Sequence, residues 1–147
     1  MFKNILIPTD GSEQSQRAVR MGIELAKLHG SRVTGIHVIP DYHLLIAYEG
    51  AFDPVTEERI EEEAKARAET YLGYIRSACA EAGGVQCATV CETSDHPYDA
   101  ILRTADTHHC DLILMTSHGR KGLAAVLLGS ETRKVLTHAK VPVLIVR

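Results

Sequence analysis

The sequence lacks an excess of positive charge. Its 16 lysines and arginines are outnumbered by 19 aspartates and glutamates, which gives a formal net charge of −3. Proteins that bind nucleic acids or anionic membrane surfaces normally carry a basic bias. The composition therefore argues against a general affinity for either partner, although it leaves room for one local basic patch.

The sequence also lacks a long apolar run. No stretch approaches the roughly 20 apolar residues that a membrane-spanning helix needs. The apolar segment at residues 5–8 is too short for a signal peptide, and no small-residue cleavage site follows it. We therefore expect a cytoplasmic protein. The 147 residues contain no repeats, linkers or low-complexity tracts, which predicts a single domain over residues 1–147.

The sequence lacks the cysteine spacing of a disulfide framework, so we expect reduced thiols. The four cysteines are Cys79, Cys87, Cys91 and Cys110. Cys87 and Cys91 lie on one predicted strand, about 13 Å apart at roughly 3.3 Å per residue. One metal ion cannot bridge that distance, and the adjacent residues 108–110 point in different directions at a predicted helix end. We therefore predict no metal site made by protein side chains.

Short apolar, β-branched runs alternate with amphipathic helical patterns along the chain. Strands are predicted at residues 4–8, 32–39, 85–92, 111–116 and 141–146. Helices are predicted to begin at the N-caps Ser12 and Ser130, at Pro54 and at Pro97, and Gly30 is expected to end the first of them. This order predicts an α/β fold with a doubly wound, five-stranded parallel sheet and helices on both faces.

In such a sheet, ligands bind beyond the carboxyl ends of the strands, where the winding direction reverses. If the strand at 111–116 lies beside the strand at 4–8, the loops at residues 8–12 and 116–130 meet there. Both loops contain small residues and lead into a helix N-terminus, whose backbone N–H groups and dipole favour an anion. Arg120 and Lys121 add positive charge, and Ser130 and Thr132 offer hydroxyls to a phosphate or a metal ion.

A structural interpretation of the same loops stays open. A glycine-containing connection before a helix N-cap is common, and here the glycines can serve only to turn the chain. The sequence has neither the P-loop pattern GxxxxGK[ST] nor GxGxxG after the first strand. Spacing alone therefore permits both a phosphate-binding loop and a plain connection.

Four segments together are similar to the universal stress protein family. They are ILIPTDGSE, HVIP, DLILMTSHGRKG and LLGSETRKVLTHAKVPVLIV. The resemblance spans the whole chain. It implies a Rossmann-like fold, related to that of the adenine nucleotide alpha hydrolases, with strand order 3-2-1-4-5 and usually a dimer.

The ATP-binding branch of this family carries a motif of glycine, two residues, glycine, nine residues, then glycine with serine or threonine. Gly119, Gly129 and Ser130 match this motif, whereas Thr116 stands in place of the first glycine. The threonine puts a side chain where backbone would approach the nucleotide, but it is small and its hydroxyl can hydrogen-bond. The resemblance implies bound ATP with Mg²⁺. It also implies a stress-response switch with at most slow hydrolysis, because no catalytic residue accompanies the loop.

The resemblance assigns roles residue by residue. The residues expected at the adenosine end are Pro8, Thr9, Asp10, Val38 and Met115. The resemblance implies that Val38 meets the adenine through its backbone. The residues expected around the phosphates are Thr116, Ser117, His118, Gly119, Arg120, Gly129, Ser130, Glu131 and Thr132. Structural alternatives stay open for three of these residues: Val38 and Met115 can be core residues, and Asp10 can be only a turn residue. A lone loop histidine, His118, is weak support for proton transfer.

The predicted last strand is apolar on both faces, and Pro142 is tolerable at a sheet edge. An uncovered edge of this kind promotes aggregation, and the resemblance implies a homodimer through Val141–Val146. The alternative function is a nucleotide-independent homodimeric interaction protein, with residues 41–52 as a docking surface or lid. A nucleotidyl transferase is a third possibility, but no His-x-Gly-His pattern follows the first strand.

Overall fold

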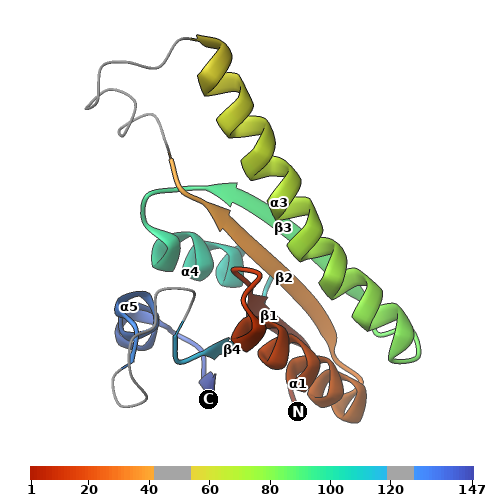
Figure 1. The fold of residues 1–147 in the computed structure, drawn as a ribbon. Coiled ribbons are helices and arrows are strands. Elements are labelled where there is room, and N and C mark those ends of the chain that lie inside the picture. Colours follow the sequence, from red (N-terminus) through yellow and green to blue (C-terminus); the bar gives the residue numbers. More distant parts are fainter. Residues whose placement is uncertain (42–53, 119–127) are drawn as a thin grey trace.

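The computed structural model describes residues 1–41, 54–118 and 128–147. Within these ranges the strands form one parallel sheet of five strands in the order β3-β2-β1-β4-β5, which confirms the predicted topology (Figure 1). The strands are β1 (Asn4–Pro8), β2 (Arg32–Ile39), β3 (Cys87–Thr93), β4 (Leu112–Thr116) and β5 (Val143–Val146). The helices are α1 (Glu13–His29), α3 (Pro54–Glu81), α4 (Pro97–Thr107) and α5 (Ser130–His138).

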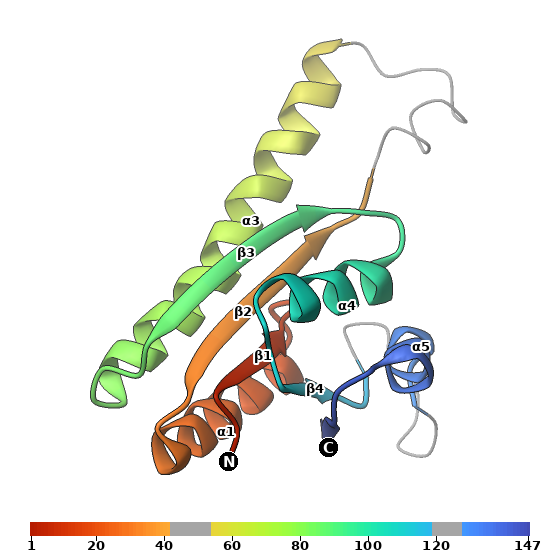
Figure 2. The same cartoon turned by 180° about the vertical axis from the view of Figure 1, so that it is seen from behind.

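The helices cover both faces of the sheet. Helices α1 and α3 lie on one face, and α4 and α5 lie on the other (Figures 1 and 2). Successive side chains of β1 point to opposite faces of the sheet. Ile5 and Ile7 pack with α1 and α3, while Leu6 packs with α4 and α5. All three side chains are fully buried, as expected for a central strand of a parallel sheet. None of the helices in the described ranges is both long and apolar enough to cross a membrane.

Helix α1 begins and ends where the sequence predicts. Ser12 is its N-cap, and the Ser12 hydroxyl accepts a hydrogen bond from the Ser15 N–H at 3.2 Å. Gly30 ends the helix in the left-handed conformation, with φ of 65°. Because β1 ends at Pro8 and the helix is capped at Ser12, the residues between them form a tight loop at the carboxyl edge of the sheet.

Strand β4 begins one residue later than predicted, at Leu112. Two other strands begin two residues later than predicted, and each has a local cause. Strand β3 begins at Cys87 because the turn before it continues through Val85, whose N–H donates to the Cys79 carbonyl at 3.2 Å. Strand β5 begins at Val143 rather than Val141, after Pro142, which has no N–H to donate. Strand β5 lies at the edge of the sheet, as the proline suggested.

The predicted N-cap of α5 is wrong by one residue, since Gly129 and not Ser130 is the cap. The Gly129 N–H donates to the Ser117 carbonyl at 2.8 Å, and the Gly129 carbonyl accepts the first helical bond from Arg133 at 3.0 Å. The backbone contact with Ser117 fixes where the helix begins. Ser130 therefore lies exposed in the first turn, and its hydroxyl does not cap the helix.

Candidate functional site

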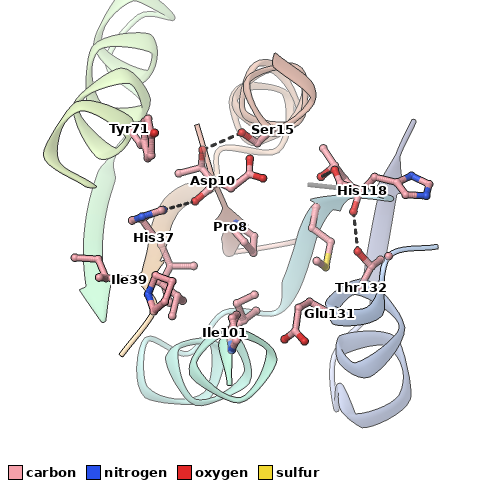
Figure 3. A pocket seen from close by; sticks show the side chains of 18 of the residues that line it. Pro8, Asp10, Ser15, His37, Ile39, Tyr71, Ile101, His118, Glu131 and Thr132 are labelled. Atoms are coloured by element: carbon pink, nitrogen blue, oxygen red, sulfur yellow. Dashed lines mark hydrogen bonds between the residues drawn. The ribbon is translucent and has the colours of Figure 1, made fainter. Parts of the chain in front are cut away.

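A cavity of about 840 Å³ lies at the carboxyl edge of the sheet, where the β1–α1 loop (residues 9–12) faces the start of α5 (Figure 3). The β1–α1 loop and the two described ends of the predicted loop at 116–130 meet there because β1 and β4 are neighbours in the sheet. The predicted residues in its wall are Pro8, Thr9, Asp10, Val38, Met115, Thr116, His118, Gly129, Ser130, Glu131 and Thr132. Ser117 is buried beside the cavity without lining it. Gly119 and Arg120 lie outside the described residues.

Hydrogen bonds fix the β1–α1 loop. The Thr9 N–H donates to the Ile36 carbonyl at 2.8 Å, and the hydroxyls of Thr9 and Ser15 are 3.1 Å apart. The Asp10 carboxylate accepts the Ser12 N–H at 3.0 Å, which closes an Asx turn. Asp10 is therefore a turn residue whose carboxylate also lies in the cavity wall, and its contact with a ribose stays a prediction.

Four polar residues of the wall had no predicted role in the site: Ser15 on α1, His37 on β2, and Arg67 and Tyr71 on α3. The His37 Nδ1 lies 2.7 Å from the Thr9 carbonyl oxygen, and its ring meets the Tyr71 ring edge-on at 5.1 Å (Figure 3). The place of His37 directly before Val38 was the available signal. Tyr71 follows the same helical spacing as the buried residues Ala64 and Ala68 of α3, so the sequence pattern does not distinguish a core position from a place in the cavity wall.

The apolar residues at the adenosine end serve the core and the cavity together. Met115 is 7% exposed and packs in the cluster beneath α4 and α5, where Val38 is partly buried. Both side chains also line the cavity, with Ile101 of α4. The core and ligand interpretations of Val38 and Met115 are therefore compatible.

The start of α5 is tied directly to the end of β4. The Thr132 hydroxyl lies within hydrogen-bond distance of the carbonyls of Thr116, at 3.1 Å, and Ser117, at 3.3 Å (Figure 3). The Thr116 hydroxyl donates to the His118 carbonyl at 2.7 Å. Both threonine hydroxyl hydrogens are thus used within the protein, so Ser130 is the more accessible hydroxyl at this end of the cavity.

His118 borders the cavity but does not aim its ring into it. The His118 Nδ1 lies 3.0 Å from the Ser117 hydroxyl, and the ring points away from Pro8 and Asp10 (Figure 3). Among the described residues, the His118 Nε2 has no hydrogen-bond partner. The geometry therefore adds no support for proton transfer to a ligand between the two loops.

Glu131 links α5 to α4. One carboxylate oxygen accepts the Tyr98 N–H at 2.9 Å, and the other pairs with the Lys134 ammonium at 2.8 Å. The side chain points toward Ile101 on α4 (Figure 3). A carboxylate accepts and does not donate, so at this position the backbone N–H, not the side chain, is suited to a phosphate. The charge stabilises the N-terminus of α4.

The four cysteines are free and none lines the cavity. Burial raises the pKa of the Cys110 thiol, and burial together with the nearby Glu69 raises that of Cys91. In the described parts of the chain, no three His, Cys, Asp or Glu side chains are grouped closely enough to hold a metal ion.

Known proteins are similar to this chain in sequence and in fold. The model of the Universal stress protein family matches residues 1–147. The universal stress protein encoded in the QAH/OAS sulfhydrylase 3′ region of Thermus aquaticus is 33% identical over 150 residues, covering 100% of both chains. The solved structure of the hypothetical protein MJ0577 of Methanocaldococcus jannaschii aligns with a TM-score of 0.78 and 30% identity, covering 99% of this chain and 96% of that one.

A more distant structure shares the fold. The universal stress protein from Archaeoglobus fulgidus, solved in complex with dAMP, aligns with a TM-score of 0.71 at 21% identity, covering 99% of this chain and 98% of that one. The sheet order, the cavity at its carboxyl edge and the full-length matches lead to one assignment. The chain belongs to the universal stress protein family.

Proposed function

We propose that this protein binds an adenine nucleotide, ATP with Mg²⁺, between the β1–α1 loop and the start of α5. In this proposal it acts as a nucleotide-dependent switch in the stress response, with at most slow hydrolysis. The observation that carries the proposal is that the β1–α1 loop and the start of α5 line one cavity, at the N-termini of α1 and α5. Helix N-termini present unpaired N–H groups and a positive dipole end to an anion.

The phosphate end is suited to backbone recognition. Gly129 presents no side chain there, and a Cβ on it would lie 3.3 Å from the Ser117 carbonyl oxygen. The N–H groups of the first turn of α5 have no acceptor within the helix, and Ser130 adds an exposed hydroxyl. When bound, Mg·ATP would supply the phosphate chain that these donors hold. In this proposal the exposed Ser130 hydroxyl is available to a phosphate oxygen or to the Mg²⁺ ion.

The adenosine end combines apolar walls with polar groups. Val38, Met115 and Ile101 offer apolar surface to a base, and Asp10 offers a carboxylate to ribose hydroxyls. The Archaeoglobus fulgidus relative was solved in complex with dAMP, so in that protein the fold holds an adenine nucleotide. This supports an adenine nucleotide as the ligand class here.

The first test is to look for nucleotide in the protein as purified. The protein is denatured fresh from purification, and released nucleotides are identified by mass spectrometry. Calorimetric titrations with Mg·ATP, AMP and cyclic AMP follow. We expect either ATP at near one per chain or a micromolar affinity for Mg·ATP. No released nucleotide and no binding heat at several temperatures would contradict the proposal.

The competing function is a nucleotide-independent interaction protein. Thr116 favours it, because this residue replaces the first motif glycine and its hydroxyl is already bonded to His118. The expected docking segment at residues 41–52 lies, after Asp41, outside the described residues. The same titrations separate the two functions, since only the interaction protein would leave every nucleotide unbound.

We also propose that two chains pair through β5. This strand is at the sheet edge, and its Leu144 is 41% exposed although it is apolar. Light scattering is expected to give twice the 16.1 kDa chain mass, and Leu144→Lys is expected to shift the mass toward the monomer. Leu28→Lys on α1 is the matched control, because Leu28 is 82% exposed and lies away from β5. A wild-type monomer at micromolar concentration would count against this interface.

A further inference from the structure

We propose that His37 is a positioning residue that keeps the backbone of Val38 available to the base of a bound nucleotide. It does so by taking the carbonyl that the Val38 N–H would otherwise bind. The inference rests on the proposed nucleotide-binding function and concerns the preference for adenine over other bases.

The hydrogen-bond pattern of β2 supports this role. In a parallel sheet, alternate residues of a strand bond to the neighbour on either side. Arg32 and Ile36 bond toward β1, through Arg32 N–H to the Lys3 carbonyl at 3.0 Å and the Ile36 carbonyl to Thr9 N–H at 2.8 Å. The Ile39 carbonyl accepts a hydrogen bond from the Ser94 N–H at 2.9 Å, on the β3 side of β2. The backbone of Val38 therefore faces the β1 side.

The β1–β2 pairing ends at Pro8, which lies opposite Ile36. Continued by one step, the ladder would join the Val38 N–H to the Thr9 carbonyl. Among the described residues this bond is absent, and the His37 Nδ1 lies 2.7 Å from the Thr9 oxygen instead. A carbonyl oxygen only accepts, so the His37 Nδ1 carries the hydrogen.

The consequence is a division of roles between neighbouring residues. The side chain of His37 satisfies the Thr9 carbonyl, and the Tyr71 ring supports the His37 ring edge-on at 5.1 Å. Val38 lines the cavity beyond the end of β1 with its backbone pointing to that side. A backbone N–H beside a carbonyl complements the N1 and 6-amino groups of adenine. The same pair opposes the N1–H and 6-oxo groups of guanine, so the backbone of Val38 can discriminate between the two bases.

The test compares the affinities for Mg·ATP and Mg·GTP by calorimetry in the wild type, His37→Leu and His37→Asn. Leucine removes the donor, so the Thr9 carbonyl and the Val38 N–H become each other's available partners. We expect the ratio of ATP to GTP affinity to fall about tenfold in His37→Leu, which is the size of one hydrogen bond. Asparagine places a side-chain N–H near the position of Nδ1, so His37→Asn is expected to restore most of the ratio.

The ratio separates positioning from a merely structural role, because general loosening of the site would weaken both nucleotides alike. His29→Leu, at the far end of α1 from Ser12, is the matched control and should leave the ratio unchanged. An unchanged ratio in a folded His37→Leu protein overturns this inference. If His37→Leu does not fold, an asparagine variant with the ratio of the wild type supports it, and one with a tenfold lower ratio overturns it. A wild type that binds neither nucleotide would instead refute the proposed function.

Discussion

Gly129→Asp is expected to lower the affinity for Mg·ATP by about 100-fold or more while the protein stays folded. The new carboxylate would lie at the N-cap of α5, where the proposal places the phosphates. It would accept the helix N–H groups that a phosphate needs, and it would repel a phosphate charge a few ångströms away by several kcal/mol at an effective dielectric of about 20. Calorimetric titration measures the affinity, and urea denaturation checks the fold.

Gly129→Ala is the matched control, because it adds the same Cβ without the charge. The φ of −57° suits any residue, and the added carbon would meet the Ser117 carbonyl oxygen at 3.3 Å, a tight contact that needs a small shift. We expect Gly129→Ala to weaken ATP binding by less than about tenfold, a smaller loss than that of Gly129→Asp. Full ATP affinity in a folded Gly129→Asp protein would show that the phosphates do not bind at this helix start.

Gly11→Ala is expected to lower the free energy of unfolding by about 3 kcal/mol. Gly11 has φ of +75°, a conformation that costs an L-residue roughly 1 kcal/mol or more. In addition, a Cβ on Gly11 would lie 2.2 Å from a carbon of the Tyr71 ring, so the ring must move, and overpacking of this kind costs about 1–3 kcal/mol. Urea denaturation followed by circular dichroism measures the change.

Gly30→Ala separates the two terms. Gly30 has φ of +65°, but nothing lies within 4 Å of the position of its Cβ. Its replacement should therefore show the dihedral cost alone, about 1 kcal/mol. The excess in Gly11→Ala should largely disappear when Tyr71 is also alanine. Equal losses in the two single glycine variants would mean that the Tyr71 ring does not pack against Gly11.

The regular parts of the molecule were predictable because their signals are local. The apolar run at β1, the Ser12 cap and the Gly30 stop each depend on neighbouring residues, and all three are confirmed. The meeting of the two loops followed from a general rule of parallel sheets, once the resemblance supplied the strand order. The fold and the place of the cavity therefore came from pattern and topology, while the ligand stays a proposal.

The contacts that shape the site were not predictable, because they join distant residues. His37 and Thr9 are 28 positions apart, and Glu131 and Tyr98 are 33 positions apart. The start of α5 was ambiguous for a different reason. Glycine and serine are both acceptable N-caps, and the backbone bond from Gly129 to Ser117 decides between them.

The same bond anchors the start of α5 to the end of β4. The Gly129 N–H and the Thr132 hydroxyl hold the helix start against Thr116, the last residue of β4, and Ser117, which follows it. Closing a longer loop costs only about 0.6 kcal/mol per doubling of its length. A change in the length of the sequence between Ser117 and Gly129 is therefore expected to leave the start of α5 in place and to cost little stability.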